Sequence, residues 1–458
     1  MAVSVMWFRR DLRLDDHPAL AAASTCGSVA GLFVADEKLL AASGVPRKRY
    51  LCDTVAALHS ESGGLSTRTG DPVIEVADFA SRVGATRVFV SDDFGPYGRS
   101  RDALVRRALT ERRIELVLVG SPYAVSPGTV LSGTGGPYKV FTPFRRAWAA
   151  TEWEAAQTAV PVDWVSPIEQ PCDDVVSQMT ASQDLVSGAD LGTNVFDRVT
   201  NRLSDFLTHQ VHGYGESRNI PALDATSRLS AALRFGLIHP RQILARLGDS
   251  PGDESFRSEL AWREFYADML WHHPNTARES MNPAMRKFPV DTDDLARVRY
   301  SAWCSGQTGF PLVDAGMRQL LEEGWMHNRL RMIVASFLVK DLHLPWQWGA
   351  RHFMNHLVDG DLASNSHGWQ WVAGTGTDAA PYFRIFNPTT QSERWDPQGD
   401  FIRRYVPELQ RLSAATIHSP SAKGRGVPLG YANPIVDHNT ERIESLRRYA
   451  LVRSENLS

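Results

Sequence analysis

The sequence predicts an amino-terminal α/β domain with a doubly wound parallel sheet, followed by a larger domain made of helices. In the first 120 residues, short β-branched or aromatic runs alternate with segments of helical periodicity, as in chains that pair parallel strands with crossover helices. From Phe196 onward the strand signals fade and apolar residues recur at helical spacing. A length of 458 residues also exceeds what one hydrophobic core usually serves, which favours two domains.

The amino-terminal domain contains runs with strand character and runs with helical character in alternation. The predicted strands are Val3–Phe8, Val29–Ala35, Arg87–Ser91 and Glu115–Gly120. The predicted helices between them are Pro18–Ala23, Lys48–His59 and Arg99–Arg112. No GxGxxG motif follows the first strand, so the ordinary dinucleotide-binding fingerprint is missing. Because ligands of such sheets bind outside the carboxyl ends of the strands, we expect any ligand of this domain there.

A connector rich in Pro, Gly, Ser and Asp runs from Ser121 to Val195, with an ordered part predicted at Phe141–Ala156. Between Thr151 and Val195 it carries eight acidic residues and no Lys or Arg. The net charge of the whole chain is −3, so the remainder is slightly basic, and a basic face for a polyanion is compatible with the composition. The predicted regions are an α/β domain at 1–125, an interdomain linker at 126–195 and a helical domain at 196–458.

Several segments of the helical domain have apolar residues three and four positions apart, which predicts amphipathic helices. The predicted helices are Leu203–Gln210, Ser230–Phe235, Pro240–Leu247, Phe256–His272, Pro311–Glu323, Arg329–Leu342 and Trp346–Leu357.

The cysteine and hydropathy patterns predict a protein of the reducing cytoplasm. The four cysteines are scattered without CxxC spacing, which argues against a disulfide frame and against a zinc cluster. The 14 histidines show no HExxH or other ligand spacing, so no metal site is predicted. No signal peptide opens the chain, and no apolar run reaches the roughly 18 residues of a membrane span.

The segment from Asp359 to Pro388, DGDLASNSHGWQWVAGTGTDAAPYFRIFNP, is the most informative part of the chain. It combines an Asp-x-Asp pair, two tryptophans two residues apart, small-residue turns and an aromatic exit. Tryptophan is large, and its N–H requires a partner when it is buried. Trp369 and Trp371 beside Asn365 predict a wall around a flat aromatic ligand. The alternative is a buried, tryptophan-rich loop.

The segment Asp224–Ser230 reads DATSRLS and predicts a helix start with several hydroxyl groups. The unbonded N–H groups and the dipole at such a start favour a phosphate, and the hydroxyl groups add donors. The alternative is a plain N-cap formed by Asp224 or Thr226.

The motif ELAWREFY at Glu259–Tyr266 lies on a predicted helix. Residues three and four apart are neighbours on a helix, so Glu259, Trp262, Arg263 and Tyr266 share adjoining faces. A carboxylate, a tryptophan and an arginine gathered in this way can hold a base by stacking and hydrogen bonding. The alternative is an amphipathic helix with surface ion pairs.

The motif WMHNRLRM at Trp325–Met332 follows a glycine and opens a helix. Arg331 has a permanent positive charge and a rigid fork of donors. If it is buried it requires a carboxylate, and Asp359 and Asp361 are the best candidates. A flavin beside such a pair is held more easily in its anionic reduced form, because a fixed cation lowers the cost of negative charge. The alternative is a pair of surface arginines.

These motifs follow one another in an order that is typical of one family. They are WFRRDLRLDDH at 7–17, TSRLS, ELAWREFY, GWMHNRLRM, and DGDLASNSHGWQW through PYFRIFNP. The chain strongly resembles the DNA photolyase/cryptochrome family, and most of all the bacterial class I cyclobutane pyrimidine dimer photolyases. The resemblance covers nearly the whole chain and is weakest at about residues 151–195 and after Leu412.

The resemblance implies a non-covalent FAD, folded into a U, so that the helical region would be an all-α FAD-binding domain. Tyr214 and Thr226–Ser230 would hold the phosphates and ribose, and Asn365 would face flavin N5. Asparagine there is typical of photolyases and suits FADH⁻, whereas plant-type cryptochromes carry aspartate. The implied FAD-binding residues are Tyr214, Thr226, Ser227, Arg228, Leu229, Ser230, Phe256, Glu259, Arg263, Trp325, Asn328, Arg331, Asp359, Gly360, Asp361 and Asn365.

The resemblance also implies UV-damaged DNA as the substrate. Trp262 and Trp371 would wall the base pocket, and Arg218 and Arg329 would contact phosphates. A cyclobutane dimer pairs poorly, so flipping it out of the duplex costs less than flipping a normal base. Met332 at the pocket wall resembles cyclobutane-dimer enzymes, whereas (6-4) photolyases are expected to have histidines in their pocket. The implied DNA-binding residues are Arg218, Glu259, Trp262, Asn328, Arg329, Met332 and Trp371.

The implied mechanism is light-driven and redox-neutral. Excited FADH⁻ donates one electron to the dimer, the ring opens and the electron returns, so the flavin carries the chemistry and the protein positions it. The implied catalytic residues are Glu259, Asn365, Trp369 and Trp346. The alternatives are a cryptochrome-type blue-light photoreceptor without repair activity and a flavoprotein whose electron transfer does not use light.

The chain departs from the family pattern at the tryptophans that carry electrons to oxidised flavin. Trp369 matches the flavin-proximal tryptophan and Trp346 the middle one. The distal tryptophan should fall near Asp293, but none lies between Lys287 and Tyr300. Tyr300 or a tryptophan from elsewhere is the candidate substitute.

A second, antenna chromophore is implied in the α/β domain. The segment DDFGPYGRSRD at Asp92–Asp102 resembles members that use 8-hydroxy-deazaflavin, and methenyltetrahydrofolate is the alternative. The competing interpretation is a strand-to-helix loop with capping aspartates. The implied antenna residues are Arg10, Lys48, Asp93 and Arg101. We expect a monomer.

Overall fold

The structure is a computed structural model that describes residues 2–167, 194–379, 381, 384–421 and 426–455. The part of the predicted linker at 168–193 lies outside the described residues. The chain divides into two compact units. Unit 1 consists of Met1–His212, Ser227–Pro274 and Val358–Asp361, and unit 2 of Gly213–Thr226, Asn275–Leu357 and Leu362–Ser458.

In unit 1 the described residues form a five-stranded parallel sheet with the order β3-β2-β1-β4-β5. Its strands are β1 (Val3–Phe8), β2 (Ser28–Asp36), β3 (Leu65–Gly70), β4 (Arg87–Val90) and β5 (Glu115–Leu118). In the register, Val5 pairs with Ala30 on one side and with Val88 on the other. The predicted α/β class is therefore confirmed, and the predicted strands β1, β2, β4 and β5 are present. Strand β3 was not predicted.

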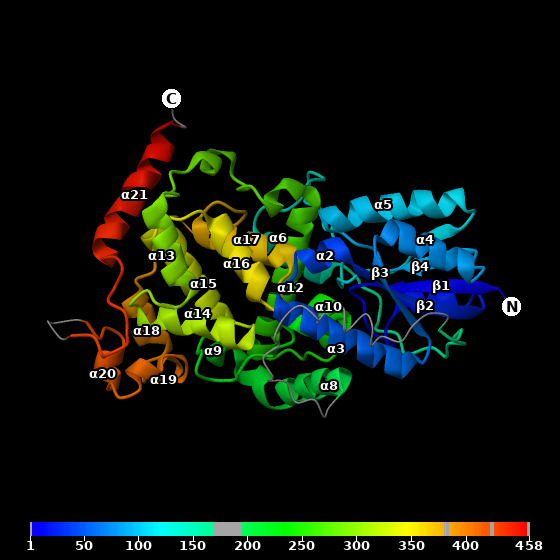
Figure 1. Cartoon of the computed structure of the whole chain (residues 1–458), viewed down its shortest axis with the longest axis horizontal. Coiled ribbons are helices and arrows are strands. Elements are labelled where there is room, and N and C mark those ends of the chain that lie inside the picture. Colours follow the sequence, from blue (N-terminus) through cyan, green and yellow to red (C-terminus); the bar gives the residue numbers. More distant parts are fainter. Residues whose placement is uncertain (1, 168–193, 380, 382–383, 422–425, 456–458) are drawn as a thin grey trace. The chain divides into compact units, whose positions relative to one another are not determined.

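Helices cover both faces of this sheet. They are α1 (Pro18–Ser24), α2 (Glu37–Ala41), α3 (Val45–Ser62), α4 (Pro72–Arg82) and α5 (Pro96–Glu111). Because crossovers between parallel strands are right-handed, the reversal of strand order at β1 sends α4 and α5 to the face opposite α3 (Figure 1). Val5, Leu32, Phe79, Val88 and Leu109 are buried in the core on this sheet, each contributing roughly 1.5–3 kcal/mol on the usual area scale.

The remainder of unit 1 is helical. Its elements are α6 (Phe141–Ala150), α8 (Val195–Asp205), η1 (Phe206–Gln210), η2 (Val211–Gly213, ending in unit 2), α10 (Ser230–Phe235), α11 (Pro240–Leu244) and α12 (Pro251–His272). Helix α12 starts at a capping box in which the Ser250 and Asp253 side chains each accept from the other's backbone N–H, with Pro251 at the first helical position. A Cβ at Gly252 would lie 1.9 Å from the carbonyl oxygen of Val211, so only glycine fits this crossing.

The carboxylate of Glu264 on α12 binds the segment that follows strand β5. It accepts hydrogen bonds from Ala124 N at 2.6 Å, from Val125 N at 3.0 Å and from Trp148 Nε1 at 2.6 Å. The side chain is 2% exposed, and burial raises the pKa of Glu264 although the three donors act to lower it. Three donors therefore depend on one buried side chain.

Replacing Glu264 by alanine should lower the free energy of unfolding by roughly 3 kcal/mol or more, because each buried donor left without an acceptor costs about 1–3 kcal/mol. Urea unfolding followed by circular dichroism measures this loss. The matched control is Glu254→Ala on the same helix. Glu254 pairs with Arg145 and Arg257 and is 43% exposed, so its removal should cost at most about 1 kcal/mol. Equal losses for the two variants would contradict the role of Glu264.

The regular elements among the described residues of unit 2 are all helices, as predicted. Its elements are η3 (Pro274–Ala277, starting in unit 1), α9 (Tyr214–Ser217), η4 (Pro283–Lys287), α13 (Asp294–Cys304), α14 (Pro311–Glu323), α15 (Asn328–Ser336), η5 (Phe337–Asp341), α16 (Trp346–His356), α17 (Leu362–Ala373), α18 (Pro388–Trp395), α19 (Asp400–Tyr405), η6 (Pro407–Leu409), α20 (Ala414–Ile417) and α21 (His438–Glu455). Helices α9, α13, α17, α18, α19, α20 and α21 were not predicted. Among the described helices, none is long and apolar enough to cross a bilayer.

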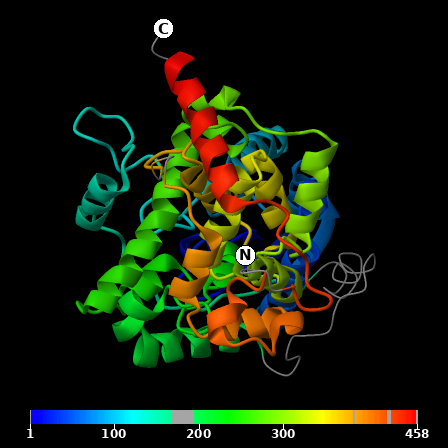
Figure 2. The same cartoon turned by 90° about the vertical axis from the view of Figure 1, so that its left-hand side faces the viewer.

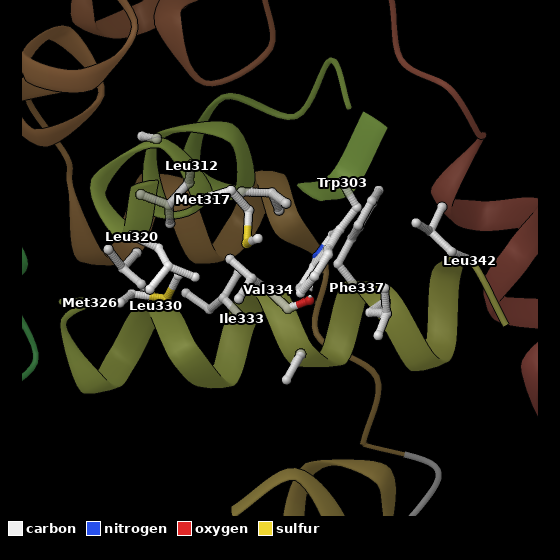
Figure 3. Packing of buried hydrophobic residues seen from close by; sticks show 14 of the residues in the cluster. Trp303, Leu312, Met317, Leu320, Met326, Leu330, Ile333, Val334, Phe337 and Leu342 are labelled. Carbon is white, nitrogen blue, oxygen red and sulfur yellow. Dashed lines mark hydrogen bonds between the residues drawn. The ribbon is translucent and has the colours of Figure 1, made fainter. Parts of the chain in front are cut away.

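Helices α13, α14 and α15 contribute a large part of the core of unit 2. Trp303 is fully buried and donates its Nε1 hydrogen to Val334 O at 3.0 Å (Figure 3). Figure 3 shows Met317 and Leu320 of α14 facing Leu330 of α15 in the same cluster. The buried indole is thus satisfied by a main-chain carbonyl, as a tryptophan inside a core requires.

Helix α21 lies across the side of unit 2 that faces the viewer in Figure 2. Its first residue, His438, contacts the buried carboxylate of Asp341 at 2.5 Å between Nδ1 and Oδ1. Burial raises the pKa of Asp341 to about 6, although the His438 contact acts to lower it. Toward its other end, α21 packs Val452 against Met285. The helix is therefore attached at both ends.

Candidate functional site

The carboxyl ends of β1 and β4, where the strand order reverses, carry a network of buried charges in unit 1. Arg9 binds Asp102 at 2.6 Å and the carbonyl oxygen of Ser91. The Ser91 hydroxyl donates to Asp11 at 2.6 Å, and Asp11 lies 3.2 Å from His17. Burial acts to raise the pKa of Asp11, but His17 and Ser91 outweigh it and the net pKa is lowered. The expected ligand edge of the sheet is thus polar and charged.

The structure places two of the four expected antenna residues in direct contact. Arg101 Nη2 lies 3.2 Å from Asp93, and a Cβ at Gly98 would come within 2.1 Å of the Asp93 carboxyl carbon. Arg10 instead binds Asp361 at 3.1 Å, and Lys48 is half-buried on α3. An implied antenna residue therefore contacts an implied FAD-binding residue.

The Asp359–Asp361 turn is held by cations of unit 1. The carbonyl oxygen of Gly360 accepts from Arg234 Nε at 3.1 Å and from Arg47 Nη1 at 3.4 Å. Asp361 also lies 3.8 Å from Arg234, and burial lowers the pKa of that arginine to about 10. In unit 2, Arg331 donates Nε to Met326 O at 2.8 Å. The predicted pairing of Arg331 with Asp359 or Asp361 stays a prediction.

Helix α12 positions the ELAWREFY side chains as its periodicity predicts. The Trp262 ring stacks on Phe141 of α6, with centroids 3.7 Å apart and planes 10° apart, so one face of the indole is fixed. Arg263 donates to the carbonyl oxygens of Pro122 and Leu233, at 3.1 Å each, and its guanidinium lies 4.6 Å from the Tyr123 ring centroid. Arg263 thus connects α12 to the segment at Pro122 and to helix α10 at Leu233 through main-chain carbonyl groups.

The TSRLS segment is not a conventional helix cap. The N-cap of α10 is Leu229, which makes no side-chain cap bond, so the alternative of a plain cap by Asp224 or Thr226 is wrong for this helix. Arg228 has φ of 51°, in the left-handed region that costs a non-glycine residue on the order of 1–3 kcal/mol. Such strain persists where the surroundings impose it, often at ligand sites.

Residues Leu362–Ala373 of the tryptophan-rich segment form helix α17. The chain turns after this helix at Gly374, with φ of 73°. On α17, Asn365 donates Nδ2 to Ala350 O of α16 at 2.9 Å. Four residues later Trp369 is 3% exposed, and its Nε1 has no hydrogen-bond partner among the described residues. A buried indole N–H without an acceptor fits a ligand with polar ring atoms beside α17.

Aromatic rings form a continuous series in unit 2. Trp369 contacts Trp303 with centroids 6.1 Å apart, and Trp303 stacks on Tyr300 at 6.0 Å. Tyr300 contacts Trp348 at 5.2 Å and donates its hydroxyl to Trp348 O at 3.1 Å. Trp346, the expected middle tryptophan, donates Nε1 to Ser280 Oγ at 3.3 Å. Sequence reasoning named Tyr300 as a substitute for the distal tryptophan but did not name Trp303 or Trp348. The only sequence feature that could have indicated these two tryptophans is the local density of aromatic residues.

The expected DNA-facing residues of unit 2 lie on or next to helices α9, α15 and α17. Asn328 is exposed at the first turn of α15, and Met332 and Trp371 are half-buried. Arg329 donates Nη2 to Asn219 Oδ1 at 2.6 Å, and Arg218 lies 5.3 Å from the Tyr214 ring. Three further side chains near Arg329, those of Arg384, Arg394 and Trp395, were missed by sequence reasoning.

An α/β sheet unit and a helical unit with these features have the fold of the photolyase/cryptochrome class. The structure is similar to a class III photolyase from Agrobacterium tumefaciens, with a TM-score of 0.90 and 35% identity over 99% of this chain and 98% of that one. It is also similar to an archaeal photolyase from Sulfolobus tokodaii, with a TM-score of 0.86 and 28% identity over 98% of this chain and 99% of that chain.

Sequence comparison agrees with the fold. Residues 4–162 match the model of the DNA photolyase family, and residues 256–451 match that of the FAD binding domain of DNA photolyase. The deoxyribodipyrimidine photo-lyase of Escherichia coli (strain K12) is 38% identical, over 99% of both chains. The chain therefore belongs to the DNA photolyase family, and the predicted resemblance is confirmed.

Gly349 on α16 controls the position of Trp369, since a Cβ there would lie 2.1 Å from Trp369 Cη2. Gly349→Ala should therefore displace the indole and destabilise the protein by roughly 1–3 kcal/mol or more, as overpacking does. Thermal unfolding and near-ultraviolet circular dichroism measure the two effects. The matched control is Gly368→Ala on α17, where a Cβ meets nothing within 4 Å and helix propensity favours alanine by up to about 1 kcal/mol. A stable Gly349→Ala with an unchanged spectrum would contradict this packing.

Proposed function

We propose that this protein is a deoxyribodipyrimidine photolyase, which uses light to repair cyclobutane pyrimidine dimers in DNA. The observation that carries the proposal is the similarity to the Escherichia coli photo-lyase over 99% of both chains. Asn365, Glu259 and Met332 are the residue types that the repair enzymes of this family carry. The curated relatives from Escherichia coli, Vibrio cholerae and Agrobacterium fabrum, 37–38% identical over nearly the whole chain, are photo-lyases, which disfavours the cryptochrome alternative.

The proposed cofactor is FAD, which supplies the light-driven electron when it is bound in its reduced form. The buried Trp369 N–H and the adjacent Asn365 amide on α17 support this assignment. We assign the chain's own residues three tasks. Tyr214 and Thr226–Ser230 hold the phosphates and ribose, Asp359–Asp361 and Arg331 supply fixed charges beside the ring, and Asn365 presents a neutral amide to it.

The proposed substrate site binds a dimer flipped out of the duplex. Trp262 and Trp371 are the apolar walls, and the stacking of Trp262 on Phe141 supports this assignment because it fixes the indole in place. Glu259 and Asn328 hydrogen-bond the polar edges of the bases. These two polar side chains orient the bases of the dimer. Cleavage of the cyclobutane ring itself needs no general acid or base.

The remaining assignments rest on the resemblance. We propose an antenna chromophore, 8-hydroxy-deazaflavin or methenyltetrahydrofolate, bound in the sheet domain by Arg10, Lys48, Asp93 and Arg101. The Sulfolobus relative, by contrast, contains two FAD molecules, with a novel light-harvesting cofactor implied. The proposed domains are residues 1–125, a linker at 126–195, and residues 196–458. The protein is proposed to be a cytoplasmic monomer without a metal.

Illuminating the FAD-loaded, reduced protein with an oligonucleotide that carries one thymine dimer should restore two intact thymines, measured by chromatography of the digested DNA. A dark reaction is the control for light. Trp371→Ala should weaken dimer binding by roughly 1–3 kcal/mol through lost base stacking. Arg297→Gln, at an exposed position on α13, should bind as the wild type does. Absence of restored thymines under reducing conditions would reject the proposed function, and light-dependent partner binding without repair would favour the photoreceptor.

We propose further that the aromatic series of unit 2 replaces the missing distal tryptophan in photoreduction. Trp369 would supply one electron to a bound, photoexcited oxidised flavin and would recover an electron from Trp303. Trp303 would in turn recover an electron from Trp348 across the Tyr300 ring, and an added thiol would restore Trp348. Burial raises the pKa of Tyr300, and its hydroxyl donates to a carbonyl oxygen, so the hydroxyl keeps its proton. We therefore propose that the Tyr300 ring mediates the electron transfer without losing that proton.

Trp348→Phe and Trp303→Phe should slow light-driven reduction of bound oxidised FAD by dithiothreitol at least several-fold. Tyr300→Phe keeps the ring and should retain the wild-type rate. Flavin absorbance measures the rate, and transient absorption of oxidised tryptophan gives an independent reading on the protein itself. If Trp346→Phe alone abolishes reduction and Trp348→Phe has no effect, the route is wrong.

A further inference from the structure

Trp395, the last residue of α18, lies beneath two arginine side chains of unit 2. The guanidinium carbon of Arg329 is 4.4 Å from the indole centroid, and that of Arg394 is 4.5 Å from it. The ring is fixed from within its own helix, because its Nε1 donates to Gln391 Oε1 at 3.0 Å. Its other contacts are with the hydrophobic core of the unit, against which it is half-buried. The indole is thus a rigid support for two cations.

Arg329 is held in place without being neutralised. Nη2 donates to the neutral amide of Asn219 at 2.6 Å, and Nη1 reaches only the sulfur of Met332, at 3.9 Å. Its Nε is buried and has no hydrogen-bond partner among the described residues. In the described part of the chain no carboxylate lies within ion-pair distance of Arg329. The guanidinium is therefore oriented but retains its charge and donor capacity.

Three more arginines surround Arg329 in the same unit. Burial, and after it the charges of Arg218, Arg394 and Arg384, lower the pKa of Arg329. Gathering four like charges costs electrostatic free energy, which a bound polyanion recovers. Arg384 and Arg394 are exposed, so their donors are accessible to a ligand from solution.

We propose that Trp395 is a positioning residue that stacks Arg329 and Arg394 so that their N–H edges bind two phosphates of the DNA backbone. The inference rests on the proposed function, which supplies DNA as the ligand. A planar guanidinium on an aromatic face has its donors directed outward in a fixed fork, which matches the geometry of a phosphate. Arg329 was expected to contact phosphate, whereas Arg394 and Trp395 are new to the site.

Phosphate contacts act on affinity and on its salt dependence rather than on sequence preference. Each neutralised phosphate of a duplex contributes roughly 0.9 to the slope of the logarithm of affinity against the logarithm of salt concentration. Trp395→Leu should therefore reduce this slope by roughly 1 to 2. It should weaken binding by about 3- to 30-fold, the range expected for a cation–π contact. The loss should be similar for undamaged duplex and for duplex with one thymine dimer.

The experiment measures fluorescence anisotropy of both duplexes in the dark, at several KCl concentrations, with the FAD-loaded protein. Trp395→Phe keeps an aromatic face and should retain most of the affinity and slope, whereas Trp395→Leu should not. Arg329→Lys provides a second measurement on a surface variant, because it keeps the charge but loses the planar fork. It should lose affinity in the wild-type background and lose little in the Trp395→Leu background.

A double-mutant cycle separates positioning from a general structural effect. If Trp395 acts through Arg329 and Arg394, Trp395→Leu should weaken binding less than threefold when it is added to Arg329→Gln with Arg394→Gln, and more than that in the wild-type background. Arg297→Gln is the matched control, because Arg297 is also exposed and lies 5.9 Å from a tryptophan ring, that of Trp348. Flavin absorbance and thermal unfolding verify that each variant is folded.

The outcomes distinguish the inference from the proposed function. Unchanged affinity and slope in Trp395→Leu, or fully additive effects in the cycle, would overturn the role of Trp395 while leaving repair intact. A wild-type protein that binds duplex DNA with steep salt dependence but does not restore thymines would reject the repair function. The Trp395 measurements on undamaged duplex would still decide the inference.

Discussion

The organisation of unit 1 depends on one buried carboxylate. Glu264 lies at the point where helix α12 meets the chain leaving the sheet, and it is the shared acceptor for two main-chain amides and the indole of Trp148. Five residues before it on the same helix is Glu259, and two residues before it is Trp262, both assigned to the substrate site. The Glu264 contacts therefore fix the helix on which both of these residues lie. A rigid supporting shell of this kind is what keeps a functional group in a productive position.

Two groups of arginines serve different purposes. Three arginines of unit 1 are buried and paired, Arg9 with Asp102, Arg101 with Asp93 and Arg241 with Asp16. In the described part of unit 2, Arg329 and Arg394 rest on an aromatic ring and have no carboxylate partner. Pairing a buried arginine with a carboxylate maintains the stability of the fold, because a buried charge without a partner strongly destabilises the folded state. Leaving a charge unpaired at the surface keeps it available to an anion, which is the behaviour expected of a surface that binds nucleic acid.

The sequence predicted elements well where apolar periodicity was regular, and poorly where buried positions were polar or small. Helix α14 was predicted with its observed bounds because apolar residues such as Leu312, Met317 and Leu320 make up most of its buried face, although Asp314 and Gln319 are buried there too. Strand β3 was missed because Ser66, Thr67 and Arg68 are buried in it, so it shows no apolar run. Helix α17 was missed because small and polar residues such as Ser366 and Gln370 are buried on it. Side-chain pairs from distant segments, such as Arg329 with Trp395, have no local signal at all, since spacing along the chain does not report contacts between separate helices.

The short segment Val358–Asp361 belongs to unit 1 although its neighbours in the chain belong to unit 2. Arg10 is paired there with Asp361, across a separation of 351 residues. During synthesis on the ribosome, more than three quarters of the polypeptide is made before the Asp361 carboxylate can pair with Arg10. An amino-terminal fragment cut anywhere before this turn would lack that carboxylate, and the two units cannot be produced as independent pieces by dividing the gene at a single place.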